Sequence, residues 1–248
     1  MSKSDKDTEK MKRIIGIAPA PIMGAPEDPT GNDKYNLGCN YVNRTTEAGC
    51  VPICLAPTDY RLSEEALDLC DGFLVQGGSE FYLYHFQIIH HAITRGKKYL
   101  GICLGQQLIY VYFELRRRVE ELGYEGDLVE AIYGYMTAQE KGFTVQKRIP
   151  DHRKTPPKRG CEDEAKHDVD IVPGTILHRL LGRDKMRICS FHKLCTPPTQ
   201  ELVRINAWSA LGDGVVEGTE YGDNILGVQG HPEYDNLLPE IFSFLSED

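Results

Sequence analysis

The first half of the chain alternates short apolar runs with longer segments of mixed polarity. The apolar runs are rich in Ile, Leu and Val and predict strands at residues 13–18, 51–56, 71–75 and 98–102. The mixed segments predict helices at residues 32–49, from Ser63 onward, and at 81–95, with glycines at 49 and 96 as stop signals. Continuous apolar strands that alternate with helices predict a parallel sheet with helices on both faces.

The second half is richer in short strand patterns. Its candidate strands are residues 142–149, 168–172, 186–191, 202–207, 214–217 and 225–229, and a single clear helix at 175–181 separates them. Strands that follow one another without helices favour antiparallel pairing. We therefore expect an α/β fold with a mostly parallel central sheet, flanked by helices and carrying an antiparallel extension in the C-terminal half.

One domain covers residues 13–248 in this interpretation, after a polar, disordered tail at residues 1–12. An insertion at about 116–160 interrupts the domain, because the helix after the fourth strand continues through residues 116–121 and a second helical pattern follows at 127–138. Residues 147–159 then hold six Lys or Arg and three prolines. This stretch is a solvated surface loop, a cover over the active site or a rim that attracts anions.

Composition and charge exclude several classes of protein. The net charge of -9 argues against a nucleic-acid partner, whose phosphates need a basic surface. No signal peptide and no apolar run long enough for a membrane span can be recognised, so we expect a cytoplasmic protein. The eight cysteines form no C-x-x-C pair, and in that compartment they should be free thiols.

The strongest chemical motif surrounds Cys103. The sequence Gly-Ile-Cys-Leu-Gly lies between the strand at 98–102 and an amphipathic helix, which is the pattern of a nucleophile elbow with cysteine as the nucleophile. The sharp turn strains the backbone and leaves no room for side chains on its neighbours, which explains the flanking glycines. It also places the sulfur at a helix N-terminus, which favours a thiolate.

A base and an orienting carboxylate for this cysteine are predicted in Gly-His-Pro-Glu, directly after the strand at 225–229. His231 and Glu233 are two residues apart in extended backbone, so their side chains point to the same side. The carboxylate can then accept the second ring N–H of the histidine and fix its tautomer. Zinc deaminases share His-x-Glu, but they need a later P-C-x-x-C motif that this chain lacks.

An oxyanion hole needs two backbone N–H groups that face the substrate carbonyl. Leu104, the residue after the nucleophile, supplies one of them. Gly78, in the Gly-Gly pair that follows the third strand, is the candidate for the other.

Three motifs together resemble the class I glutamine amidotransferase family. They are Gly-Ile-Cys-Leu-Gly-Gln-Gln, Gln-Gly-Gly-Ser-Glu and Gly-Val-Gln-Gly-His-Pro-Glu. Within that family the chain looks most like the free-standing γ-glutamyl hydrolases, including those that act on γ-glutamyl-γ-aminobutyrate. The resemblance covers roughly residues 13–238 and implies a flavodoxin-like glutamine amidotransferase fold, no metal and no cofactor. It also implies that Gln107 lines the glutamyl pocket and that His192 contacts the α-carboxylate or the leaving group.

The chain departs from this family at the edge of the pocket. Gly230 stands where relatives commonly carry tryptophan, and Lys193 and Leu194 replace the usual residues after His192. We expect the space beside Gly230 to be filled by an insertion aromatic, namely Tyr124, Tyr133 or Tyr135, or by the substrate.

The leading functional hypothesis is a cysteine hydrolase that cleaves a γ-glutamyl amide bond through a Cys103–His231–Glu233 triad and a glutamyl thioester. Its partner would be a small γ-glutamyl substrate, and a homodimer is possible. A glutaminase subunit that supplies ammonia to a separate synthase is the second hypothesis. A binding module without catalysis on the same scaffold is the third.

Overall fold

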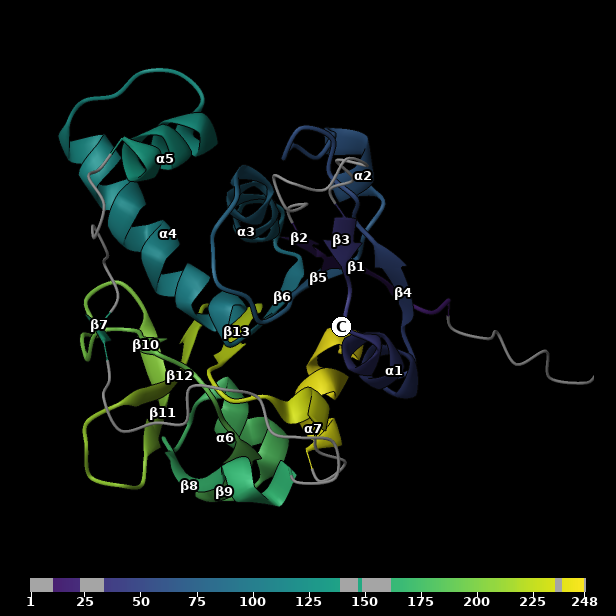
Figure 1. Ribbon diagram of the computed structural model, residues 1–248, viewed down its shortest axis with the longest axis vertical. Helices are drawn as coiled ribbons and strands as arrows, with labels where there is room; N and C mark the ends of the chain where they lie inside the picture. The colour runs from purple at the N-terminus through teal and green to yellow at the C-terminus, as the bar shows by residue number, and fades with distance from the viewer. Residues whose placement is uncertain (1–10, 23–33, 139–146, 149–161, 235–237, 248) are drawn as a thin grey trace, which may run out of the picture.

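A large sheet with helices on both faces forms the body of the protein (Figure 1). The computed structural model describes residues 11–22, 34–138, 147–148, 162–234 and 238–247. Its strands are β1 (Ile14–Ala18), β2 (Ala20–Ile22), β3 (Lys34–Asn36), β4 (Val51–Cys54), β5 (Gly72–Val75), β6 (Lys98–Ile102), β7 (Lys147–Arg148), β8 (Lys166–Ile171), β9 (Lys185–Cys189), β10 (Leu194–Cys195), β11 (Arg204–Ser209), β12 (Val216–Tyr221) and β13 (Ile225–Val228). Its α-helices are α1 (Cys39–Glu47), α2 (Glu64–Asp68), α3 (Leu83–Arg95), α4 (Leu104–Glu121), α5 (Leu128–Thr137), α6 (Ile176–Leu181) and α7 (Pro239–Ser243), and short 3-10 turns lie at Glu162–Ala165, Pro232–Tyr234 and Phe244–Ser246.

The central sheet has two parts that differ in strand direction. Its order is β4-β1-β5-β6-β13-β12-β11-β8-β9. The strands from β4 to β13 pair in parallel, and the pairs from β13 to β9 are antiparallel. The expected α/β class with an antiparallel extension in the C-terminal half is therefore confirmed.

Two hydrophobic layers cover the sheet. In β5, Phe73 and Val75 pack on the side of α3 and α4, while Leu74 packs on the opposite side with α1, α6 and α7. Figure 1 shows these two groups of helices on either side of the sheet. Because successive strand residues point to opposite faces, an uninterrupted apolar strand is what a sheet covered on both sides requires.

The segment at 116–160 begins as a pair of helices. The last turns of α4 extend beyond the sheet and pack against α5. Buried Glu114 accepts hydrogen bonds from Arg117 and Arg118, which gives the charged end of α4 a local partner. Both predicted helical stretches of the insertion are thus present, and residues 139–146 and 149–160 of it lie outside the described residues.

Several predicted boundaries need correction. The helix expected at 32–49 begins only at Cys39, because Lys34–Asn36 pairs with Ala20–Ile22 in a small antiparallel sheet. Residues 147–148, inside the strand predicted at 142–149, pair with Leu194–Cys195, a two-residue strand that the sequence pattern did not predict. The tail at 1–12 and the strand at 142–149 fall mostly outside the described residues, so these remain predictions.

No helix in the described ranges has both the length and the apolar character that crossing a bilayer demands. Cys39, Cys50, Cys54, Cys70 and Cys103 are free thiols, and Cys161 lies outside the described residues.

Candidate active site

Cys103 lies at a sharp turn between β6 and α4. Its backbone angles, φ 54° and ψ -101°, are in a region that non-glycine residues avoid. Such strain costs about 1–3 kcal/mol and persists only where the surroundings impose it. A methyl group on Gly101 would lie 2.3 Å from the Gly105 carbonyl oxygen, and one on Gly105 would lie 2.2 Å from the Val75 oxygen. Both glycines are therefore required, as the elbow motif predicts.

His231 follows β13, the strand that pairs in parallel with β6. In this register Ile102 is opposite Val228, and the Cys103 amide donates to the Val228 oxygen at 2.9 Å. Cys103 and His231 thus leave the same carboxyl edge of the sheet from neighbouring strands. This edge is where open α/β sheets usually bind their ligands.

Glu233 holds the imidazole of His231. The His231 Nδ1 and a Glu233 carboxylate oxygen are 2.7 Å apart, and both side chains are buried. Burial alone lowers the pKa of His231, but Glu233 and the adjacent Cys103 outweigh it and raise that pKa to about 10. Nε2 has no hydrogen-bond partner that meets normal geometry among the described residues, so it is available toward the sulfur.

Two further residues, Phe191 and Tyr41, lie against the His231–Glu233 pair, and the sequence analysis did not predict either of them. Phe191 lies flat against His231, with ring centroids 3.8 Å apart and planes 4° from parallel. Tyr41, on α1, is buried, and burial first and the Glu233 carboxylate second raise the pKa of its phenol. Tyr41 is the middle residue of Asn-Tyr-Val, and Phe191 is the middle residue of Ser-Phe-His. Both short stretches match the family, and that match was the signal in the sequence that could have pointed to these two residues.

The Gly77–Gly78 turn faces the cysteine from the end of β5. A methyl group on Gly77 would lie 2.9 Å from the His231 Cε1 and 3.4 Å from the Cys103 Cβ, so glycine is needed there. The Gly77 amide donates to the Tyr41 hydroxyl at 3.2 Å. Gly78 packs against Leu104, whose amide is at the first position of α4. The two predicted oxyanion residues, Gly78 and Leu104, are therefore neighbours.

The predicted substrate residues Gln107 and His192 both line the pocket beside Cys103. The Gln107 amide nitrogen donates to the Leu194 carbonyl at 2.6 Å and to the Gln229 side chain at 2.9 Å. His192 places Nδ1 3.0 Å from the Leu194 oxygen and Nε2 3.5 Å from Glu217. These polar groups already contact the protein, which makes both residues parts of the pocket wall.

The pocket has a volume of about 670 Å³. Residues from both halves of the chain line it, because the sheet brings their loops to one edge. They include Asn36, Tyr41, Gln76, Gly78, Phe81, Cys103, Leu104, Gln107, Phe191, His192, Lys193, Leu194, His231 and Tyr234. The Gln76 side chain accepts from the Gly38 amide at 3.1 Å and donates to the Asn36 oxygen at 2.7 Å, which fixes the loop before α1 against the site.

The expectation that an aromatic of the insertion fills the space beside Gly230 was wrong. Ile188, on β9, fills it, since a methyl group on Gly230 would lie 2.8–2.9 Å from three Ile188 side-chain atoms. Tyr124 is exposed, and Tyr133 packs near Phe86 in the core layer of α3 and α5. A branched side chain from the antiparallel part of the sheet replaces the bulk, with no need for an aromatic from the insertion.

A parallel sheet with a cysteine elbow, and with a histidine–carboxylate pair at the same edge, defines a cysteine hydrolase of the class I glutamine amidotransferase type. The sequence profile of the Peptidase C26 family matches residues 82–233, and the chain belongs to this family. Membership supports an amidohydrolase.

Several known proteins are similar to this chain in sequence or in fold. Protein NtpR of Enterococcus hirae is 26% identical over 246 residues, which cover 90% of this chain and 92% of that protein. CTP synthase of Sulfurimonas denitrificans is 29% identical over 206 residues, 75% of this chain but 36% of that longer protein. The glutaminase domain of the Trypanosoma brucei CTP synthase, solved with bound acivicin, has the same fold with a TM-score of 0.61 and 18% identity, covering 94% of this chain and 92% of that one.

Proposed function

We propose that the protein hydrolyses a γ-glutamyl amide bond with Cys103 as nucleophile, His231 as acid and base, and Glu233 as the residue that orients His231. One observation carries this proposal: the strained cysteine elbow and the buried histidine–carboxylate pair meet in a single pocket. A strained backbone at a pocket is typical of functional sites.

The charges of the site support a cysteine-based mechanism. A raised pKa makes His231 an imidazolium at neutral pH, and its positive charge favours a negative sulfur beside it. The sulfur attacks the γ-carbonyl carbon, and a tetrahedral intermediate forms. His231 then transfers its proton to the amine nitrogen as the carbon–nitrogen bond breaks, which leaves a glutamyl thioester on Cys103.

Water completes the reaction. His231 is now neutral and accepts a proton from a water molecule while the oxygen of that water attacks the thioester carbonyl. The carbon–sulfur bond breaks, glutamate leaves, and the thiolate–imidazolium pair is restored. In both steps we propose that the amides of Gly78 and Leu104 stabilise the negative oxygen, since the two residues are in contact and Leu104 directly follows the nucleophile.

The family resemblance and the pocket both support the proposed substrate class. A cavity of about 670 Å³ is large enough for a glutamyl group with a sizeable amine. We propose that Gln107 and His192 contact the glutamyl part as wall residues. Lys193, exposed at the pocket, is a cation within reach of a substrate carboxylate.

The test is a hydrolysis screen with free glutamate as the readout. The panel contains γ-glutamyl amides of ammonia, a polyamine, an ω-amino acid, a peptide and an aromatic amine, with α-glutamyl isomers as matched controls. We expect release from at least one γ-linked compound, none from its α-linked isomer, and none with Cys103→Ala. Hydrolysis by Cys103→Ala, or no turnover of any γ-linked compound by the folded enzyme, would contradict the proposal.

A glutaminase that supplies ammonia is the second candidate. The chain aligns with CTP synthase over only 36% of that protein, and its fold covers a solved glutaminase domain almost completely. In this case glutamine alone would be a poor substrate, and a separate synthase would stimulate its hydrolysis. A binding module without catalysis predicts ligand binding to wild-type protein without glutamate release from any compound.

A further inference from the structure

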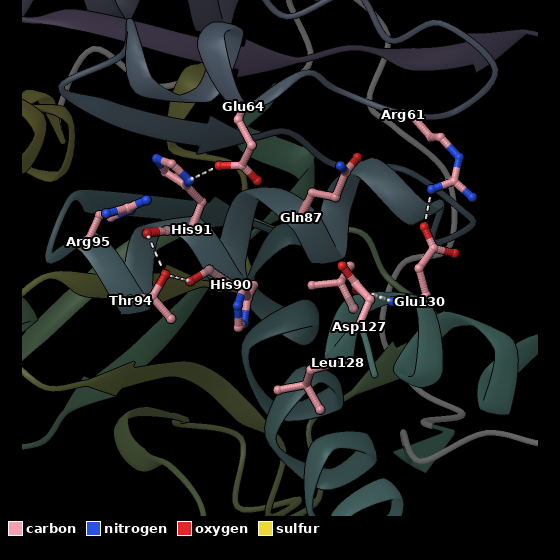
Figure 2. Close-up of a pocket in the computed structure, with 11 residues that line it drawn as sticks. Arg61, Glu64, Gln87, His90, His91, Thr94, Arg95, Asp127, Leu128 and Glu130 are labelled. Carbon is pink, nitrogen blue, oxygen red and sulfur yellow. Dashed lines mark hydrogen bonds and ion pairs between the residues drawn. The ribbon is translucent and has the colours of Figure 1, made fainter. Parts of the chain in front are cut away.

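A second pocket lies between α2, α3 and the start of α5, and it shares no lining residue with the active-site pocket (Figure 2). Its volume is about 420 Å³ and its walls are mostly polar. Arg61 and Glu130 form an ion pair across it, and His91 points toward Glu64 beside it. The proposed hydrolysis uses none of these groups.

His91 is the unusual member of this region. It lies on α3 and is only 4% exposed, with its ring edge-on to Phe73 at a centroid distance of 5.9 Å. Its Nδ1 is 3.5 Å from a Glu64 oxygen, and its Nε2 is 3.3 Å from an Asp68 oxygen. Within the described part of the chain, Nε2 has no partner that meets hydrogen-bond geometry. The buried Nε2 therefore faces the Asp68 carboxylate without a hydrogen bond, while Nδ1 faces Glu64.

The contacts of His91 leave this arrangement incomplete. Its buried Nε2 lies 3.3 Å from an Asp68 oxygen and makes no hydrogen bond within the described residues. A neutral imidazole has one N–H and one lone pair, whereas both of its nitrogens here face carboxylate oxygens. One nitrogen lone pair is then directed at a negative oxygen. A cation between them would turn this repulsion into attraction.

We propose that Glu64, Asp68 and His91 bind a first-row divalent cation, with Zn²⁺ as the best match to the donors. One ligand atom from each residue lies within 4.8 Å of the others. A neutral imidazole and two carboxylates are ligands that Zn²⁺ accepts at about 2.0–2.2 Å, with water in an open position. The cation would join α2 to α3 and stabilise the fold.

The carboxylates can close on the ion at little cost. Glu64 and Asp68 are four residues apart, so they share one face of α2, and their side chains are 72% and 59% exposed. His91, fixed by its packing, would provide the rigid ligand. Lys97 and Arg95 are the nearby cations that oppose binding, but the Lys97 ammonium donates to the backbone oxygens of Leu67 and Asp68 and leaves the carboxylates free.

The experiment must exclude the active-site thiol, since Cys103, His231 and Glu233 could themselves bind zinc. We therefore use the full chain with Cys103→Ala, free of any affinity tag and treated with chelator. Zn²⁺ is titrated by calorimetry, and the melting temperature is measured with and without it. Glu64→Gln and Asp68→Asn remove one exposed ligand each, and Glu65→Gln on the same helix is the matched control.

We expect Zn²⁺ to raise the melting temperature of the parent and of Glu65→Gln, because a ligand that binds only the folded state stabilises it. Glu64→Gln and Asp68→Asn should melt like the parent without metal, yet bind Zn²⁺ about tenfold or more weakly. Co²⁺ in place of Zn²⁺ should give weak visible bands without the strong thiolate absorption. The proposal is overturned if the parent binds no Zn²⁺ at millimolar concentration, if both ligand variants bind it like Glu65→Gln, or if Co²⁺ shows thiolate ligation.

Discussion

The two halves of the proposed catalytic site are held in opposite ways. Around Cys103 the restraint is backbone against backbone, since Gly101 and Gly105 lie too close to carbonyl oxygens for any side chain. Around His231 the restraint comes from side chains: Glu233 on its Nδ1, Phe191 on its face and Ile188 against the preceding glycine. Substitutions at the glycines around the nucleophile should therefore be tolerated poorly, while substitutions of the side chains that pack against His231 should be tolerated better.

The largest effect is expected from Cys103→Ala. Removing the nucleophile should lower glutamate release by about 10⁴-fold or more, while the melting temperature changes little because alanine keeps the Cβ and the turn. Cys54→Ala, at an exposed thiol, is the control and should keep full activity. Alkylation near neutral pH should modify Cys103 first, and faster labelling of another cysteine would argue against its assigned role.

The next largest effect is expected from Glu233→Gln, which tests the side-chain contacts that hold His231. The carboxylate stabilises the imidazolium during the reaction, so kcat should fall about 100-fold or more with a smaller change in KM. Glu201→Gln, on the surface, should leave both constants unchanged.

The same variant has a definite pH signature. Glu233 is one of the groups that raise the pKa of His231, so its neutralisation lowers that pKa and the ring loses its proton at a lower pH. The alkaline limb of the activity profile should then move toward neutral pH. A limb that stays in place would mean that some other group holds the charge of His231.

Gly105→Ala tests the backbone contacts around Cys103, and its effect is measured as a change in the free energy of unfolding. Its new methyl group would meet the Val75 carbonyl at 2.2 Å, and neither main chain can move without distorting β5 or α4. We expect a loss of about 3 kcal/mol in the free energy of unfolding, measured with urea. Gly134→Ala, inside α5 with no atom near the new methyl group, should instead gain about 0.5–1 kcal/mol. Equal effects at the two glycines would remove the distinction drawn above.

The smallest effect is expected at Gly230. A methyl group there contacts only the Ile188 side chain, so Gly230→Ala should cost about 1–2 kcal/mol. Ile188→Val removes one of the three contacted atoms, and the double variant should cost less than the sum of the two single changes. Simple additivity in this double-mutant cycle would show that the two residues do not compete for space.

The sequence was sufficient for features that depend on local pattern. The apolar runs at β1, β5 and β6 predicted the parallel sheet, and the spacing of Gly101, Cys103 and Gly105 predicted the strained turn, because both signals lie within a few consecutive residues. The parallel pairing of β6 with β13 then brings Cys103 and His231 to the same edge of the sheet.

Features that depend on contacts between distant segments were not predictable. Tyr41 reaches the Gly77 amide and the Glu233 carboxylate from α1, and Ile188 fills the space beside Gly230 from β9. Nothing in a tyrosine or an isoleucine within its own segment indicates such a partner. The strand at Lys34–Asn36 lies within the range predicted as a helix for the same reason, since its pairing with β2 is tertiary.

The parallel stack of Phe191 on His231 has a spectroscopic consequence. Protons held above the face of an aromatic ring experience its ring current and resonate upfield of their usual positions. With centroids 3.8 Å apart, the imidazole protons of His231 lie in that region. The imidazole resonances of His231 should therefore be shifted upfield in an NMR spectrum. The ionisation of the proposed base can then be followed in solution without a substrate.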